Sequence, residues 1–508
     1  MHFLRIRSIL VAIGGLAMAF WFGQAIGEGN TGPPIMTAMI ATAVWFLLSI
    51  RRTIIALLTS IPLTGRLFSV PFGPTPFELS MAMLVPQVTL QIMLKKMAPR
   101  FGSPWIVFPA AGLLAILTFH FFAQGTGARV LGAESVGARF YLDCYLGLAA
   151  YLILASANLD LRDLRPFAIC ALVPALIVGG IDVLLFLKPN LTGRVYALYS
   201  QFTWDAAGAY LGQGELIRIG GLRDLGIAIL LVMLSYRRVN AFWNRDCWWT
   251  VPLGIFSLGC MFAGGFRSYL MLYGLILALF SLLDLRWRAF IPAAILVVVV
   301  LLVAAGHSHL YELPRFMQRP ISFLPGDWDP EVKWQAGSTV DWRAELWAYF
   351  FKWEFPAQPW FGRGLGFKMD EMGRLSFNPL YYGIGPFVEM RMWHSGLVSA
   401  LDATGIIGTI FWIATNVGCF IVVMRGLRAL NSGPQPPALR FLVMKTASLL
   451  FFTAFTGNGL EADLYPLLTF TGFLEVGLRK SGQPPGLPPA IAREAGGGAS
   501  PPDWDARA

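Results

Sequence analysis

Histidine is scarce in this chain, and one of its five histidines stands where it could move a proton. His394 follows a long stretch without an apolar span and opens a run rich in small residues, from Ser395 to Gly408. An imidazole at a helix end can accept a proton near neutral pH, which predicts a general base. Asp402 follows about two helical turns later, close to the same face, and could orient or charge-stabilise the ring. The alternative for His394 is a helix cap without a chemical role.

Arginine supplies a second kind of chemistry, because the planar guanidinium binds phosphate oxygens at two points. Arg267 lies in a tight turn, 264–270, between two apolar runs. An arginine near hydrocarbon costs about 3 kcal/mol, so it usually has a partner or a function; the alternative is a side chain that extends to the interface. Arg343 and Arg363 are further candidates. Arg363 sits in the glycine-rich turn 359–367, which lacks the strand and helix that flank a nucleotide-binding loop.

No metal or cofactor is expected from the remaining residue types. His307 and His309 form an isolated HxH at a helix end, and such a pair is usually solvated. The cysteines show no CxxC spacing and predict neither a thiolate metal site nor a disulfide framework: Cys144, Cys170, Cys247, Cys260 and Cys419. The chain also lacks a P-loop.

The elements that must position these residues are membrane spans. Hydrophobic residues make up 56% of the chain and charged residues only 13%, a composition that would leave aggregating patches on a soluble domain. The apolar residues come in blocks of roughly 17–25, the length that crosses about 30 Å of hydrocarbon. The sequence therefore predicts an all-α, polytopic transmembrane bundle of about 12–14 spans. The candidate spans are 8–26, 33–50, 53–72, 77–94, 104–122, 139–157, 167–187, 223–236, 250–266, 269–284, 289–305, 398–424, 441–456 and 463–478.

The basic residues predict how the spans are oriented. The formal net charge of +10 could indicate nucleic-acid binding, but the basic pairs sit at the ends of apolar blocks, as in positive-inside anchoring. We therefore expect no nucleic-acid partner and both termini in the cytoplasm. No small-residue cleavage site followed by a soluble domain comes after the basic N-terminus, so residues 8–26 are expected to form a retained first helix. Alternation then puts the following pairs on the cytoplasmic side: Arg5/Arg7, Arg51/Arg52, Lys95/Lys96, Arg162/Arg165, Arg237/Arg238, Arg286/Arg288, Arg425/Arg428 and Arg479/Lys480.

The longest connection, residues 306–393, breaks the regular pattern and would lie outside. It holds seven of the 17 tryptophans, and a structureless loop of this length would be unusual, so we expect a folded cap over the active site. Helical spacing from Asp341 to about Phe355, after Ser338-Thr339, predicts an amphipathic helix on the membrane surface. The chain thus divides into an N-terminal transmembrane region (1–305), the large periplasmic loop (306–393), C-terminal transmembrane helices (394–480) and a disordered cytoplasmic tail (481–508).

These residues together resemble the O-antigen ligase and polymerase superfamily of bacterial membrane proteins. The most specific likeness is the ligase pattern of His, then Asn, Ser or Gln, nine residues, Gly, two residues, and Gly, Thr or Val; it is filled here by His394, Ser395, Gly405 and Gly408. The turn at Arg267 is similar to the family's Ser-Arg-Gly element, although serine follows the arginine. The stretch from Arg343 and Trp347 to Gly366 is similar to the family's loop signature. The motifs cover roughly residues 250–425.

The resemblance implies a metal-independent, inverting glycosyltransferase that moves a glycan from undecaprenyl pyrophosphate to an acceptor hydroxyl. The site would face the periplasm from the bacterial inner membrane, and the partners would be this donor, a lipid-A-core or growing polysaccharide acceptor, and membrane lipids. His394 would act as general base, and arginines would stabilise charge on the departing pyrophosphate. The residues expected to be catalytic are His394, Arg267 and Arg343; those expected to bind substrate are Arg363, Trp347 and Asp402.

Three alternatives stay open at this point. A polysaccharide polymerase uses the same donor and differs only in the acceptor, as does a protein-glycosylating member of the group. A transporter or flippase is the alternative of another class, and polar residues within spans, such as Asp182, Lys445 and Glu475, would serve as its relays. Transport predicts internal pseudo-symmetry and broken helices in corresponding halves, and we find neither in the sequence.

Overall fold

The structure is a computed structural model that describes most of the chain. The described residues are 49–66, 73–123, 135–157, 165–192, 195, 219–237, 239, 248–285, 290–307, 309–368, 384–432, 436–455 and 459–481. The predicted spans 8–26 and, but for two residues, 33–50 lie outside them, as does the predicted tail apart from Ser481.

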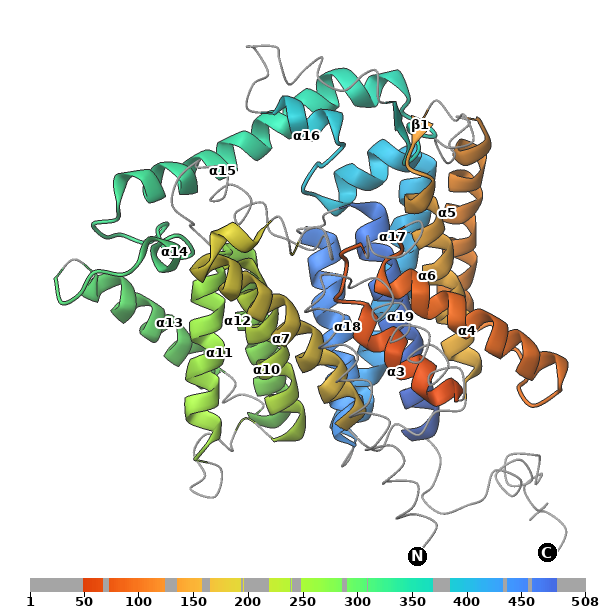
Figure 1. The fold of residues 1–508 in the computed structure, drawn as a ribbon, viewed down its shortest axis with the longest axis horizontal. Coiled ribbons are helices and arrows are strands. Elements are labelled where there is room, and N and C mark those ends of the chain that lie inside the picture. Colours follow the sequence, from red (N-terminus) through yellow and green to blue (C-terminus); the bar gives the residue numbers. More distant parts are fainter. Residues whose placement is uncertain are drawn as a thin grey trace, which may run out of the picture.

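Helices dominate the described part of the chain (Figure 1). The bundle consists of α3 (Ile50–Ser60), α4 (Pro76–Met93), α5 (Pro104–Ala123), α6 (Ala138–Ser156), α7 (Arg165–Leu187), α10 (Gly220–Tyr236), α11 (Thr250–Gly264), α12 (Arg267–Leu285), α13 (Phe290–Gly306), α17 (Gly396–Asn431), α18 (Pro437–Phe455) and α19 (Leu460–Ser481). Two short strands, β1 (Ser135–Val136) and β2 (Phe367–Lys368), form one antiparallel pair.

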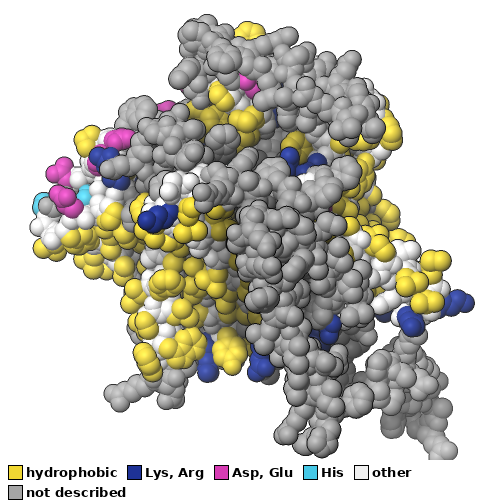
Figure 2. Space-filling model, in the orientation of Figure 1, with side chains coloured by type: hydrophobic (Ala, Val, Ile, Leu, Met, Phe, Trp, Pro, Cys, Tyr) yellow, Lys and Arg dark blue, Asp and Glu magenta, His cyan; other side chains and the backbone are white. Residues whose placement is uncertain are grey.

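Six of the described helices are long and apolar enough to cross a membrane: α5, α6, α7, α12, α17 and α18. Figure 2 shows apolar side chains over the flank of the bundle, where a soluble protein would carry polar ones. The predicted all-α, polytopic membrane fold is confirmed. From α4 onward the predicted and observed bounds of the spans agree within a few residues, except that α17 continues to Asn431, beyond the predicted end at 424; α5, for example, covers Pro104–Ala123 against the predicted 104–122.

The predicted span 53–72 is not one continuous helix. α3 has 11 residues and ends at Ser60, and residues 67–72 lie outside the described part. At 1.5 Å per residue α3 is about 17 Å long, shorter than the hydrocarbon layer of about 30 Å. Pro62 follows two residues after the helix ends, in keeping with the preference of proline for positions beyond a helix C-terminus.

The long connection folds across one end of the bundle, called the cap end below (Figure 1). Its helices are α14 (Arg315–Gln318), α15 (Pro330–Tyr349), the π-helical turn η6 (Phe350–Glu354), η7 (Phe355–Ala357) and α16 (Gly385–Glu389). The start predicted for the amphipathic helix was wrong: α15 begins at Pro330, not after Ser338-Thr339. Asp329 provides the cap, because its Oδ1 accepts the N–H of Glu331 at 2.9 Å and proline follows at the first helical position.

Successive helices run in opposite directions, so their starts and ends meet at the two ends of the bundle. At the cap end, the N–H of Ile219 before α10 donates to the carbonyl of Ala263 near the end of α11, at 3.1 Å. At the opposite end, Arg440 near the start of α18 donates to Asp284 near the end of α12, at 2.7 Å. This second end is basic and carries Arg165, Arg237, Arg425, Arg428, Arg440 and Arg479 at helix starts or ends. The predicted placement of the basic end in the cytoplasm stays a prediction.

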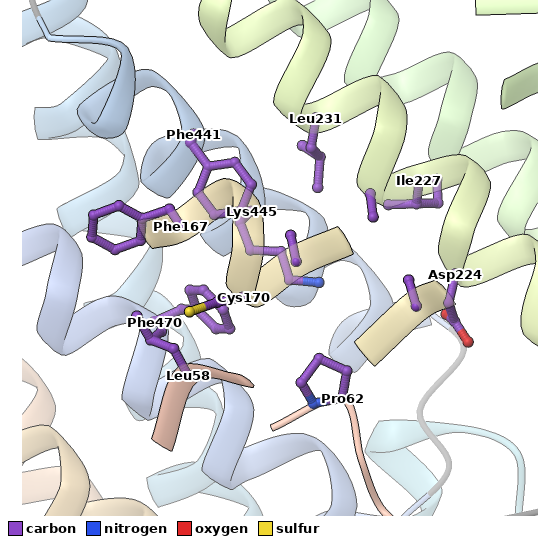
Figure 3. A pocket seen from close by; sticks show the side chains of 13 residues that line it. Leu58, Pro62, Phe167, Cys170, Asp224, Ile227, Leu231, Phe441, Lys445 and Phe470 are labelled. Atoms are coloured by element: carbon purple, nitrogen blue, oxygen red, sulfur yellow. The ribbon is translucent and has the colours of Figure 1, made fainter. Parts of the chain in front are cut away.

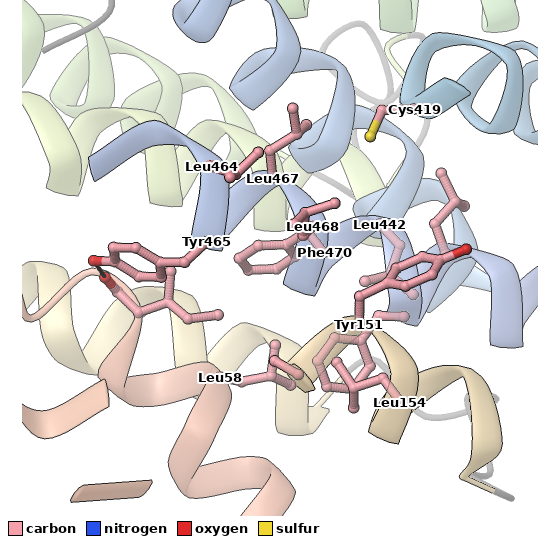
Figure 4. Packing of buried hydrophobic residues seen from close by; sticks show 14 of the residues in the cluster. Leu58, Tyr151, Leu154, Cys419, Leu442, Leu464, Tyr465, Leu467, Leu468 and Phe470 are labelled. Carbon is pink, nitrogen blue, oxygen red and sulfur yellow. Dashed lines mark hydrogen bonds between the residues drawn. The ribbon is translucent and has the colours of Figure 1, made fainter. Parts of the chain in front are cut away.

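The interior of the bundle is closely packed around α19 (Figure 4). A Cβ atom on Gly147 of α6 would lie 2.8 Å from the Cα atom of Tyr465, so glycine is needed for this approach of α6 to α19. The Tyr465 hydroxyl donates to the carbonyl of Ile61 at 3.4 Å and ties α3 to the same centre. Neighbouring Leu467 and Leu468 are fully buried. This core fixes the helices on which the cap end is built.

Candidate active site at the cap end

The helix that follows His394 is broken, and a loop fills the break. Gly405 in α17 has φ 63° and ψ −166°, a conformation that only glycine adopts readily. The N–H groups of Arg363 and Gly364 donate to the carbonyls of Asp402 and Ala403 at 2.7 and 2.9 Å. Backbone groups freed by the break are thereby satisfied. No broken helix was expected from the sequence, and the backbone of residues 359–364 fills this break.

The glycines of the predicted turn 359–367 are explained by this docking. A Cβ atom on Gly362 would lie 2.5 Å from the nitrogen of Gly405, and one on Gly405 would lie 2.3 Å from the carbonyl carbon of Trp360. Gly362 and Gly364 also have φ of 73° each. The turn is glycine-rich because two backbones meet there without room for side chains.

A buried ionic network sits inside the same junction. Arg363 donates from Nε to Oδ1 of Asp402 at 2.8 Å, with Nη2 at 2.6 Å from the same oxygen, and its Nη1 contacts Glu354. The indole of Trp393 donates to the other Asp402 oxygen, Oδ2, at 3.0 Å. The two predicted substrate-binding residues Arg363 and Asp402 are therefore paired with each other. Glu354 comes from the π-helical turn, so the network joins three segments of the chain.

His394 stands directly beside this network in a rare backbone conformation. Its φ is 51°, the left-handed region, and Arg391 three residues earlier has φ 54°. Trp393 is fully buried, and its carbonyl accepts the indole N–H of Trp347 at 2.8 Å. The imidazole itself is half-buried, with its ring centre 5.3 Å from that of Trp342 and 5.7 Å from that of Phe387. Trp393 is thus buried, whereas the next residue, His394, has a half-buried ring that lies against two aromatic side chains of the cap.

The electrostatics of this position favour a neutral imidazole. Burial, and secondly the positive charge of Arg343, lower the pKa of His394 to about 4. Burial also lowers the pKa of Arg343, whose Nε is buried without a hydrogen-bond partner among the described residues. Arg343 follows Trp342 in α15, so the cation is held on the helix that contacts the histidine. The fold therefore places a neutral base beside a cation for which the described residues provide no carboxylate partner.

Arg267 reaches the cap from another helix. It is the first residue of α12, directly after Gly265 and Phe266 close the turn, and Gly265 has the left-handed φ of 69°. Its Nη2 donates to the hydroxyl of Ser322 in the cap at 3.2 Å, and its Cζ lies 5.6 Å from the centre of the Phe323 ring. The structure therefore brings His394, Arg343 and Trp347 into one neighbourhood, and links Arg267 to the cap segment before α15.

Two of the polar residues named for the transport alternative, Asp182 and Lys445, lie between packed helices. Asp182 accepts the N–H of Gly221 at 2.6 Å, at the start of α10. Lys445 lines a cavity of about 70 Å³ together with Asp224, between α7, α10 and α18 (Figure 3). A cavity of this size holds a few water molecules but not a sugar. His307, one of the HxH pair, stacks on Trp328 with ring centres 4.8 Å apart and accepts the N–H of Leu313.

The sequence did not reveal Trp393 or Glu354 as parts of the site. Trp393 precedes the histidine directly, which was a usable signal, but its burial and its bond to Asp402 depend on the loop that docks into α17. Glu354 had no signal, because its partner Arg363 becomes a neighbour only through the π-helical turn.

Residues 252–413 match the family model described as O-antigen ligase, a stretch that contains Arg267, Arg343, Arg363, His394 and Asp402. The match supports the O-antigen ligase and polymerase superfamily that the motifs resembled. No curated protein matches the chain.

Proposed function

We propose that this protein is a glycosyltransferase of the O-antigen ligase type, which transfers a glycan from undecaprenyl pyrophosphate to an acceptor hydroxyl. The observation that carries the proposal is the half-buried His394 ring against Trp342 of α15, beside the cation Arg343 on the same helix, whose charge helps to lower the pKa of His394. A base that is neutral at physiological pH can take the proton of a hydroxyl, and an adjacent cation can stabilise an anionic leaving group. The family match over 252–413 supports the same class of reaction.

The proposed reaction is a single displacement. The acceptor oxygen attacks the anomeric carbon while the bond from that carbon to the pyrophosphate oxygen breaks, and configuration inverts. The hydroxyl proton passes to the free ring nitrogen of His394, and undecaprenyl pyrophosphate departs as the anion. Arg343 and Arg267 stabilise the charge that develops on the leaving group. No nucleotide is needed, because the donor is already activated.

The remaining predicted residues receive supporting roles in this proposal. Arg363 and Asp402 hold the broken helix and Trp393 in place instead of touching substrate, because each is already engaged by the other. Trp347 is half-buried beside the site and is the candidate for stacking on a sugar ring, while its indole N–H fixes the Trp393 carbonyl.

We further propose that the cap end faces the periplasm and the basic end faces the cytoplasm, in the bacterial inner membrane. Support comes from the arginines gathered at the end opposite the cap, which follows the positive-inside rule. A periplasmic cap would meet the donor after its glycan has reached the outer leaflet. The acceptor would then be a lipid-A core or another surface glycan.

The test uses purified protein in lipid, an undecaprenyl-pyrophosphate-linked glycan and separate candidate acceptors. Transfer to a lipid-A-type acceptor by wild type, lost in His394→Ala and Arg343→Ala, is the expected result. The control is His309→Ala, which removes an exposed histidine from the cap end. Longer chains on the carrier lipid, without transfer to the acceptor, would instead identify a polymerase. Full activity of both site variants would refute the assignment of the site.

A further inference from the structure

A second arginine packs against the turn that carries Arg267. Arg223, in the first turn of α10, has its Cζ atom 4.2 Å from the centre of the Phe266 ring and 4.5 Å from that of Tyr269. Phe266 immediately precedes Arg267, and Tyr269 lies in the same first turn of α12. A guanidinium against two aromatic rings is held by its charge and by its planar shape.

The backbone on both sides of this contact is fixed. The N–H of Ile219 donates to the Ala263 carbonyl at 3.1 Å, which joins the start of α10 to the end of α11. A Cβ atom on Gly264 would lie 2.8 Å from the Cβ of Arg223, so the two helices approach as closely as glycine permits. The chain then reverses at Gly265. The direction in which Arg267 leaves this turn therefore depends on how Phe266 and Tyr269 pack.

The charge arrangement distinguishes Arg223 from an ordinary structural arginine. Arg440 donates to both oxygens of Asp284, at 2.7 and 2.9 Å. Among the described residues, Arg223 instead contacts a carboxylate at 3.7 Å, from its Nε to Oδ2 of Asp224. The Nε atom is buried without a hydrogen-bond partner among the described residues. Asp224 also lines the cavity that Lys445 enters (Figure 3). Two aromatic rings, together with a long ion pair to Asp224, hold this guanidinium.

We propose that Arg223 is a positioning residue, whose guanidinium packs against Phe266 and Tyr269 and so sets the direction in which Arg267 presents its charge to the anionic donor. Its effect on transfer rests on the proposed function, but its effect on the turn does not. Because Arg223 acts through Arg267, replacing Arg223 should lower glycan transfer only in a protein that still has Arg267.

The first measurement is amide hydrogen exchange on the full-length protein in lipid. Arg223→Met should speed exchange at residues 265–268 and leave the other end of α10 unchanged. The matched control is Arg237→Met, because Arg237 stacks on Tyr236 at 5.3 Å at that other end. Unchanged exchange at 265–268 would overturn the proposal. This measurement decides the role of Arg223 even if wild type transfers no glycan, in which case the proposed function alone fails.

The second measurement is a double-mutant cycle on glycan transfer. Arg223→Met should lower kcat/KM by roughly tenfold, and Arg223→Lys, which keeps the charge without the planar group, should not restore it fully. In the Arg267→Ala background, Arg223→Met should cause no further loss. Independent, multiplicative losses would show that Arg223 acts by itself and would overturn the proposal. If Arg223→Met does not fold, Phe266→Leu removes one ring at unchanged charge and replaces it in both measurements.

Discussion

The indole of Trp393 donates a hydrogen bond to Asp402 across the first turns of α17, at 3.0 Å. This bond anchors the residue directly before His394, which has the left-handed φ of 51°. A strained backbone of this kind costs about 1–3 kcal/mol and persists only where its surroundings hold it. The surroundings here are a fully buried tryptophan and a carboxylate that is itself bound by Arg363.

The first prediction concerns that indole. Trp393→Phe keeps an aromatic ring in the buried position but removes the donor to Asp402, so an acceptor is left unsatisfied. We expect a loss of about 1–3 kcal/mol in the free energy of unfolding, together with reduced glycan transfer. Thermal unfolding in detergent measures the change in stability, and the transfer assay measures the change in activity. Trp353→Phe is the control, because Trp353 is 54% exposed, and an equal effect at both positions would contradict the anchoring role.

The second prediction ranks the members of the ionic network. Arg363→Met leaves two carboxylates, Asp402 and Glu354, near each other without their shared cation, and should cost about 3–5 kcal/mol. Asp402→Asn keeps the shape and should cost less, about 1–3 kcal/mol. Arg315→Met is the matched control, since Arg315 also contacts two carboxylates but is 42% exposed, and should cost less than about 1 kcal/mol. Equal unfolding temperatures for the Arg363 and Arg315 variants would show that burial does not strengthen the network.

The sequence predicted the helices well and the site only in part, for physical reasons. Apolar blocks determine where a chain crosses the membrane, so the bounds of α5 and the start of α17 could be read locally. The docking of the turn at Gly362 into the break at Gly405 depends on residues far apart in sequence, and periodicity cannot report it. The glycines were visible as a pattern, but their reason is a backbone contact. Likewise, the pairing of Arg363 with Asp402 needed the fold.

The third prediction tests this docking. Gly405→Ala places a Cβ 2.3 Å from the carbonyl carbon of Trp360 at a φ of 63°, so clash and backbone strain act together. We expect a loss of about 3 kcal/mol or more, and little folded protein after purification. Gly259→Ala in α11 is the control, because in the described part of the chain no atom outside its own helix backbone lies within 4 Å of the added Cβ. That variant should be as stable as wild type or more stable by up to about 1 kcal/mol. Normal yield and stability of Gly405→Ala would mean that α17 tolerates a straight path.

The fourth prediction is the pH dependence of transfer. A general base works when it is unprotonated, so kcat/KM should be constant above the pKa of His394 and fall as pH drops through about 4. The charge of Arg343 is one cause of the low pKa of His394, so Arg343→Gln should raise that pKa. The acid limb of the profile should then move to higher pH, even if the maximal rate falls. Burial stays in place, so the limb should not reach the ordinary histidine value.

Lys333→Gln is the control for this profile, because it removes an exposed cation from the same helix, α15. Its acid limb should coincide with that of wild type. The measurement is initial transfer rate at low donor concentration, with the protein in lipid, over the range from about pH 3 to about pH 8. The contrary result is a wild-type acid limb near the ordinary histidine pKa that does not move in Arg343→Gln. It would mean that the imidazole is not held beside this cation, and that a group other than His394 accepts the proton.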